Sequence, residues 1–510
     1  MTGKDLLKKY DTFYLILLLI ILTITIQIIY INNYNLAQED SKTPRFHFED
    51  SYGNINKVIL IDQSGVNSHV INLFDSPFIY SYWILSFSTL TGINLFNSIF
   101  LFNLLFYFIF IILIFVFIKK FAHKIIAFFT ILIFASNPYS LVMFSDPIRI
   151  VQVIFLGILS CFFYLTFLED NKNKYLIISG ILISIGFMIH YAIILFFIPI
   201  CGHILLINKR KFSTLIIIIL STLPIILSWF FIQKIFSYSG GIPSIPLITR
   251  YWDALAQTLF NGFKSSFGTS FLLVVADNLG YGGIVFLSLA FIFGTITIRN
   301  YKKDKEMSLI VLLLIFILIF FILAYPASSH YSRYPTYAFI PIILLSLTLI
   351  YKRILLLRKP YILIFLLTIF ILLTIFPIQN SNIFTYSNLY VSRVSVGELI
   401  SQSNNSGRYA IEGWPSMITP IIKADKSDKV FLLGFDLNQK LTTKLNTSFI
   451  QSKNISYFVY EEVTCFNAEC PNNYYYKQFI ELGYKLNLDT QIKDPVSESR
   501  YIKIYKIIPS

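Results

Sequence analysis

Long apolar stretches alternate with short polar segments along the first three quarters of the chain. Many of the apolar runs approach about twenty residues, the length that an α-helix needs to cross a bilayer. The first is 12–30, and the others are 95–118, 125–143, 150–168, 175–189, 191–207, 213–235, 279–298, 308–325, 334–350 and 361–377. The pattern predicts an α-helical polytopic membrane protein with about eleven transmembrane helices.

The stretch 175–207 could form two short spans or one long tilted span. Two spans place five short loops on one side of the membrane. Four of these loops are net positive, namely 119–124, 208–211, 299–306 and 351–359, and the fifth, 169–174, is neutral. Basic loops usually mark the cytoplasmic side. Charge therefore favours two spans, a cytoplasmic N-terminus and a multi-pass protein of the cell membrane.

Composition supports this class of protein. Of 510 residues, 56% are hydrophobic and only 13% are charged, too few charges to cover a soluble protein of this size. Long disordered segments are excluded for the same reason. Almost all of the net charge of +14 lies before residue 380, in the loops of the membrane region. No basic soluble patch suggests a nucleic-acid partner.

The predicted topology divides the chain into a transmembrane domain, 1–377, and an extracytoplasmic domain, 378–510. The tail contains β-rich runs at 408–412, 429–435, 455–461 and 500–507, with helical spacing at 416–424, 437–451 and 474–484. This alternation predicts a small α/β domain with a largely parallel sheet. Cys465 and Cys470 also lie in the tail, and an oxidising compartment would favour a disulfide between them.

The first outer loop, 32–94, is long for a connection. Ser76 and Pro77 are suited to the first positions of a helix, which would be rich in aromatic residues and would end at Gly92. We expect this helix to lie at the membrane interface. Several ionisable residues are also assigned to the outer side: Glu49, Asp50, Asp62, Asp146 and, in the turn between two short spans, His190.

Four motifs occur in an order that resembles the GT-C superfamily of membrane glycosyltransferases. They are Glu49-Asp50-Ser51-Tyr52 after the first span, Ser76-Pro77-Phe78-Ile79-Tyr80 at the start of the interfacial helix, Asn137-Pro138 through Asp146-Pro147 in the second outer loop, and His330-Tyr331-Ser332-Arg333-Tyr334. The resemblance extends to protein O-mannosyltransferases, aminoarabinose transferases and the catalytic subunit of oligosaccharyltransferase. The Trp-Trp-Asp motif of the last group is absent from this sequence.

The resemblance implies an inverting transferase that uses a polyprenyl-phosphate-linked sugar. Asp50, with Glu49 beside it, would be the catalytic carboxylate, Asp146 a second acid or metal ligand, and Asp62 the rival acid. Arg333, His330 and Tyr334 would bind the donor phosphate, where a guanidinium can donate two parallel hydrogen bonds. For His190, a satisfied structural histidine is the alternative to a site role.

Two other functions stay open at this stage. The chain could be a transporter or flippase of lipid-linked saccharides, although no internal repeat is visible and the acids cluster on one face. It could also be a membrane assembly protein whose tail binds partners. The sequence leaves open the sugar, the acceptor (a lipid, glycan or protein) and any requirement for a divalent cation.

Overall fold

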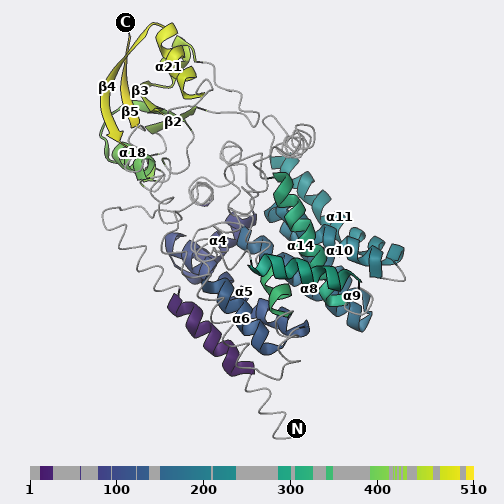
Figure 1. Ribbon diagram of the computed structural model, residues 1–510. Helices are drawn as coiled ribbons and strands as arrows, with labels where there is room; N and C mark the ends of the chain where they lie inside the picture. The colour runs from purple at the N-terminus through teal and green to yellow at the C-terminus, as the bar shows by residue number, and fades with distance from the viewer. Residues whose placement is uncertain are drawn as a thin grey trace.

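The computed structural model describes a helical bundle and a separate α/β domain. The described residues are 12–26, 58, 79–93, 95–121, 123–136, 150–207, 211–236, 285–299, 305–324, 341–348, 391–412, 417, 420, 421, 424, 426, 429–433, 445–462, 471–493 and 501–509. Figure 1 shows the α/β domain at the end of the molecule that carries the C-terminus, opposite to the N-terminus.

Most of the described helices in the bundle coincide with predicted spans. They are α5 (Leu95–Phe121), α6 (Lys124–Ser136), α8 (Ile150–Asp170), α9 (Asn173–Ile189), α10 (Ile194–Ile207), α11 (Lys211–Phe236) and α14 (Lys305–Ala324), with further helical segments at 12–26, 285–299 and 341–348. Segments Leu101–Lys120 and Val151–Asp170 are long and apolar enough to cross a bilayer. Six other described apolar helical segments are shorter. The span predicted at 361–377 lies outside the described residues.

Two short helices occupy the stretch 173–207, as the charge pattern favoured. Helix α9 ends at Ile189, a 3₁₀ turn η1 (Tyr191–Ile193) follows, and α10 begins at Ile194. His190, at the break, has an extended backbone, and its N–H still donates to the Gly186 carbonyl.

Small and hydroxyl side chains let the helices of the bundle approach closely. Helix α8 packs on α9, and α9 packs on α11. Ser160 of α8 donates to the Ser179 carbonyl of α9 at 3.0 Å, and Ser184 donates to the Thr222 carbonyl of α11 at 2.9 Å. Such hydrogen bonds and small residues are typical of helix contacts in membranes, where lipid provides no hydrophobic drive for association.

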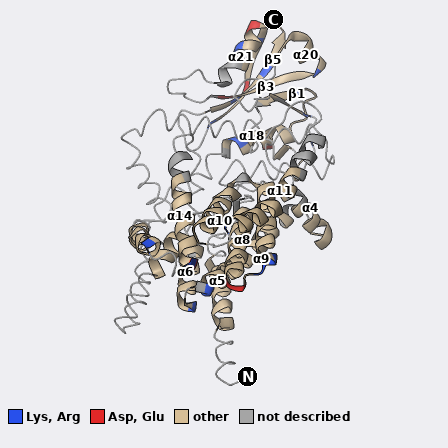
Figure 2. Ribbon diagram, turned by 90° about the vertical axis from the view of Figure 1, so that its right-hand side faces the viewer, with Lys and Arg blue, Asp and Glu red and all other residues tan. Residues whose placement is uncertain are grey.

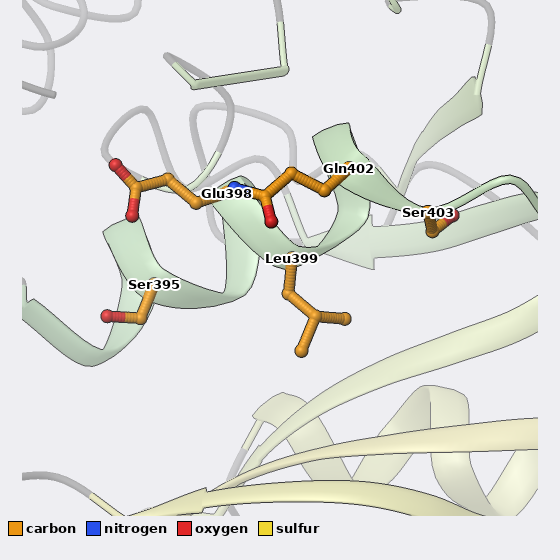
Figure 3. A pocket seen from close by; sticks show the side chains of 5 residues that line it. All are labelled: Ser395, Glu398, Leu399, Gln402 and Ser403. Carbon is orange, nitrogen blue, oxygen red and sulfur yellow. The ribbon is translucent and has the colours of Figure 1, made fainter. Parts of the chain in front are cut away.

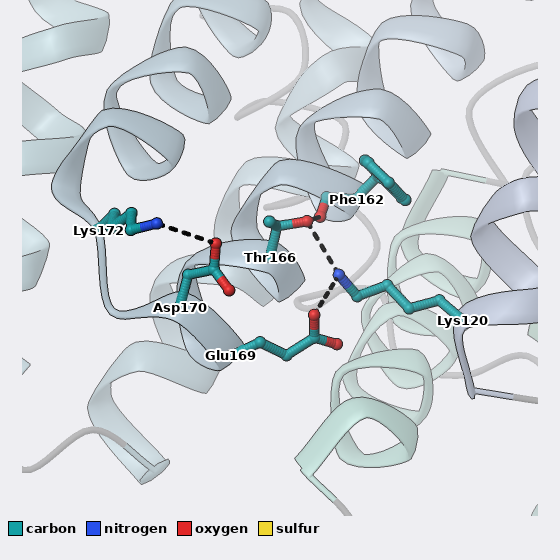
Figure 4. Close-up of polar contacts among 6 residues, drawn as sticks. All are labelled: Lys120, Phe162, Thr166, Glu169, Asp170 and Lys172. Atoms are coloured by element: carbon teal, nitrogen blue, oxygen red, sulfur yellow. Dashed lines mark hydrogen bonds and ion pairs between the residues drawn. The ribbon is translucent and has the colours of Figure 1, made fainter. Parts of the chain in front are cut away.

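Polar contacts bring several of the predicted inner loops together at one end of the bundle, the basic end. Lys120 of α5 pairs with Glu169 of α8 at 2.7 Å and donates to Thr166 at 2.9 Å (Figure 4). Lys119 donates to Thr12, at the start of the first helix, at 3.2 Å. Figure 2 shows charged residues near the ends of α5, α6 and α9 that lie toward the N-terminus, with helical segments that lack Lys, Arg, Asp and Glu above them.

A buried histidine connects two further helices near this end. Tyr164 of α8 lies 2.8 Å from His203 Nδ1 of α10, and His203 Nε2 lies 2.8 Å from the Lys305 carbonyl at the start of α14. Because a carbonyl only accepts, Nε2 carries the proton and Tyr164 donates to Nδ1. The described ends of α5, α8, α10 and α14 that carry these contacts therefore lie toward the same end of the bundle.

The C-terminal domain contains a five-stranded mixed sheet. Its strands are β1 (Arg408–Glu412), β2 (Val430–Leu433), β3 (Ile455–Glu462), β4 (Tyr484–Lys493) and β5 (Tyr501–Pro509), in the order β2-β1-β3-β5-β4. Pairs β1–β2 and β1–β3 are parallel, whereas β3–β5 and β4–β5 are antiparallel. The prediction of a largely parallel sheet was wrong for its second half, because β4 was not recognised.

Helices cover both faces of the sheet. Helices α20 (Thr447–Ser452) and α21 (Pro471–Glu481) lie over one core, which includes Ala410, Phe458 and Phe479. Helix α18 (Val391–Gln402), which was not predicted, covers the other face through Val394, Val396 and Ile400. The predicted helix 437–451 is seen only as α20, since 437–444 lie outside the described residues.

A buried ion pair attaches α18 to the sheet. Arg393 donates from Nε and Nη2 to the two carboxylate oxygens of Glu461 on β3, at 3.1 and 3.2 Å. The two residues are only 5% and 3% exposed. Such two-pronged geometry fixes orientation as well as distance.

Candidate functional site at the sheet end of the bundle

The end of the bundle opposite to the basic end carries the described part of the first outer loop, and we call it the sheet end. Helix α4 (Ile79–Thr91) lies there against α5, which confirms a helix after Pro77, while its position at the membrane interface stays a prediction. Gly92, with a φ of +69°, ends it, and its N–H donates to the Ser88 carbonyl at 2.9 Å. A glycine in this left-handed conformation is a common helix terminator.

Aromatic packing docks α4 on α5. Trp83 stacks on Phe106 with ring centroids 6.2 Å apart, and Tyr80 meets Phe102 edge to face at 6.3 Å. Such ring pairs each add about 0.5–1.5 kcal/mol beyond the area that they bury. The contacts fix one face of α4 and leave Leu90, near its end, 86% exposed.

A buried polar network joins the first turns of two helices to α5 at this end. The Asn103 amide oxygen of α5 accepts from the Tyr80 hydroxyl of α4 at 3.1 Å and from Gln152 Nε2 of α8 at 3.3 Å. All three residues are at most 3% exposed. We call these residues the Asn103 network.

One hydrophobic cluster continues from this end of the bundle into the C-terminal domain. It contains Val58 of the first outer loop, Tyr80 and Ile84 of α4, and, on the domain side, residues such as Val394 and Tyr409. Val58 is fully buried. The cluster therefore includes a point in the acidic loop, eight residues after Asp50, along with residues of α4 and of the C-terminal domain.

His190 is the one candidate residue from the sequence that lies within the described part. It is half-buried in the turn between α9 and η1, and its Nδ1 accepts from the Ala192 N–H at 3.1 Å. Its carbonyl accepts from the Ile193 N–H at 3.3 Å. These contacts show that His190 helps to shape the turn, and its role in a site stays a prediction.

The other candidates lie outside the described residues. They are Glu49, Asp50, Asp62, Asp146, His330, Arg333, Tyr334, Cys465 and Cys470. Their roles stay predictions. Within the described ranges, no group of three His, Cys, Asp or Glu residues is arranged to hold a metal ion.

A separate cavity of about 420 Å³ lies on α18 of the C-terminal domain. Figure 3 shows its lining, Ser395, Glu398, Leu399, Gln402 and Ser403. One Glu398 carboxylate oxygen is buried with no hydrogen-bond partner among the described residues. The Tyr409 hydroxyl donates to Ser403 at 3.1 Å and so connects the cavity wall to β1.

Behind that wall, Tyr409 stacks on Tyr457 with centroids 4.6 Å apart. Burial raises the pKa of Tyr457, and the neighbouring Tyr409 and Asp489 raise it further. Tyr457 therefore stays neutral at physiological pH. The pair belongs to the core of the domain, which gives it no evident chemical role.

Sequence reasoning missed Asn103 and Gln152. Both are polar residues within largely apolar helical segments. A polar residue in a transmembrane segment is a signal for a functional or structural contact. The sequence contains this signal, but it does not show with which side chains Asn103 and Gln152 form hydrogen bonds.

Comparison with known proteins identifies the fold. A family model described as dolichyl-phosphate-mannose-protein mannosyltransferase matches residues 75–232. ArnT from Cupriavidus metallidurans bound to undecaprenyl phosphate is similar over 96% of this chain and 97% of its own, with a TM-score of 0.59 and 12% identity. The chain therefore has a fold that resembles the GT-C superfamily. No curated protein matches it significantly in sequence.

A second GT-C structure agrees. The Archaeoglobus fulgidus oligosaccharyltransferase in its apo form has a TM-score of 0.57 and 12% identity, over 89% of this chain and 70% of the other. At such identity the likeness shows the fold. The family match over residues 75–232 indicates a glycosyltransferase. The transporter and assembly alternatives have no support in these comparisons.

Proposed function

We propose that the protein transfers a glycosyl group from a polyprenyl-phosphate-linked donor to a lipid, glycan or protein acceptor at the sheet end of the bundle. The observation that carries this proposal is the separation of the two ends. The described loops rich in Lys lie at the basic end, while Val58 and the Asn103 network lie at the sheet end. The sheet end would face outside the cell.

Two neighbouring structures support the substrate classes. ArnT is described bound to undecaprenyl phosphate, a polyprenyl phosphate. The oligosaccharyltransferase is described tethered to an acceptor peptide that contains an NVT sequon. A lipid-linked donor and an acceptor outside the membrane are therefore precedented on this fold.

The proposed chemistry is a displacement at the sugar's anomeric carbon. The acceptor atom forms a bond to that carbon, the bond to the lipid phosphate breaks, and the phosphate leaves with the bonding electrons. Asp50 would take the acceptor's proton, with Asp146 as the second acid. Arg333, His330 and Tyr334 would stabilise the phosphate as its charge develops.

The test is transfer by purified protein from a polyprenyl-phosphate sugar, with donor binding measured separately. Asp50→Asn keeps the shape but removes the base, so transfer should fall by about 10² or more while donor binding survives. Arg333→Ala should lower both, and Arg333→Lys should restore only part, because an ammonium group cannot donate in a bidentate manner. Asp489→Asn, on strand β4, is the matched control.

The alternatives have distinct outcomes. Near-normal transfer by Asp50→Asn would move the catalytic role to Asp62 or Asp146. Near-normal transfer by every variant, including Arg333→Ala, would contradict the assignment of these residues. A panel of lipid, glycan and peptide acceptors in the same assay would identify the acceptor class.

A further inference from the structure

The Asn103 network lies where two acid-bearing segments enter the bundle. Tyr80 is the second residue of α4, which follows the loop with Glu49, Asp50 and Asp62. Gln152 is the third residue of α8, which follows the loop with Asp146. Both side chains bond to the same oxygen atom.

Helix α5 is a suitable fixed reference for these two segments. It is 27 residues long, and many of its residues, including Phe110, Ile114 and Phe115, are fully buried. An amide oxygen has two acceptor positions, and the two donors from α4 and α8 can fill both. A shift of either first turn would therefore stretch a hydrogen bond to a helix that cannot follow it.

The burial of the Asn103 network indicates that its polar side chains do more than fill space between the helices. A polar group in an apolar interior costs free energy unless it is hydrogen-bonded, and an apolar side chain would fill the same space without that requirement. Hydrogen bonds differ from apolar contacts in having a defined length and direction. The aromatic packing docks α4 on α5, and the Asn103 network in addition fixes the position of the first turn of α4.

We propose that Tyr80, Asn103 and Gln152 are positioning residues, which hold the first turns of α4 and α8 in register so that the acidic segments before them face the same substrate. The proposal rests on the proposed function. Val58 supports it, because this residue, eight positions after Asp50, is fully buried in a hydrophobic cluster that also includes Tyr80.

The test uses variants that remove one hydrogen bond and keep the packing. Tyr80→Phe retains the ring that meets Phe102, and Gln152→Met retains the length of the side chain. Each should lower kcat about 10-fold or more with the KM for the lipid-linked donor nearly unchanged, since small misplacements of reacting groups have effects of this size. Because both act through Asn103, the double variant should lose less than the product of the two effects.

Ser160→Ala is the matched control. Ser160 is as deeply buried and makes a hydrogen bond between helices α8 and α9, yet it belongs to no part of the network. It should lower the melting temperature about as much as the test variants and leave kcat unchanged. Equal kcat in the control and the test variants, or a loss confined to KM, would overturn the proposal.

A second readout does not depend on transfer. Spin labels at Thr89 of α4 and Leu105 of α5, both exposed, report the docking of α4 in a background without the native cysteines. Tyr80→Phe and Asn103→Leu should broaden the distance distribution, and Ser160→Ala should not. Unchanged distributions would overturn the proposal. A native protein without any transfer activity would contradict the proposed function, while the distances would still decide the role of the network.

Discussion

Removal of Arg393 should destabilise the C-terminal domain strongly. Its guanidinium and the Glu461 carboxylate make two hydrogen bonds of 3.1 and 3.2 Å, and both residues are almost fully buried. Arg393→Met removes the guanidinium that donates these two hydrogen bonds to the buried Glu461 carboxylate. Breaking a buried pair in this way typically costs about 3–5 kcal/mol.

Removal of both partners should cost much less. In Arg393→Met/Glu461→Leu no charge remains to be desolvated, and replacement of a buried pair by apolar residues is often neutral or stabilising. Lys453→Met, next to β3, is a control for loss of a charge at an exposed position. We expect it to change stability by less than about 1 kcal/mol.

Hydrogen exchange in the full-length protein measures these differences. The slowest amides of β3 and α18 exchange through unfolding of the domain, so their rates report its free energy. Arg393→Met should accelerate them by two to more than three powers of ten, since about 1.4 kcal/mol corresponds to a factor of ten. Equal rates in Arg393→Met and Lys453→Met, or a double variant as fast as the single one, would refute this reasoning.

Three further predictions concern the bundle and its orientation. A Cβ at Gly180 would clash with the Ser221 hydroxyl of α11, whereas a Cβ at Gly202 would meet open space. Gly180→Ala should therefore lower the melting temperature of the protein, and Gly202→Ala should not. Burial and the adjacent Lys124 lower the pKa of His123, so folding favours the neutral ring. The melting temperature should therefore fall as the pH drops below about 6.5, and it should fall less in His123→Asn. Cysteines at the exposed positions Ser406 and Lys172 should react with an impermeant reagent from opposite sides of the membrane, and reaction from one side would contradict the topology.

Much of the bundle could be predicted because lipid imposes length and apolarity on each span. Loop charge also resolved the doubtful stretch, since two helices with a break at His190 are seen. The helix after Pro77 and its end at Gly92 followed from cap chemistry. Side-chain contacts such as those of Asn103 could not be predicted, because they depend on how helices distant in sequence face one another.

The sheet was harder to predict from local pattern. Strand β4 is an edge strand with mostly exposed side chains, so it lacks the apolar alternation by which strands are recognised. Helix α18 has only a weak apolar face, and its attachment depends on Arg393 and Glu461, which lie 68 residues apart. The candidate acids were found from motif order, which says nothing about the distances between them.

The short helices α9 and α10 bear on the membrane itself. With 17 and 14 residues they measure about 26 and 21 Å, less than the hydrocarbon thickness of about 30 Å. Their outer faces are apolar, with Ile177, Ile198 and Leu206 between 41% and 58% exposed. Thinning of the bilayer beside them is one way in which a membrane accommodates helices this short. If the bilayer thins there, the proposed lipid-linked donor would bring its phosphate below the normal headgroup plane when it approaches along this side.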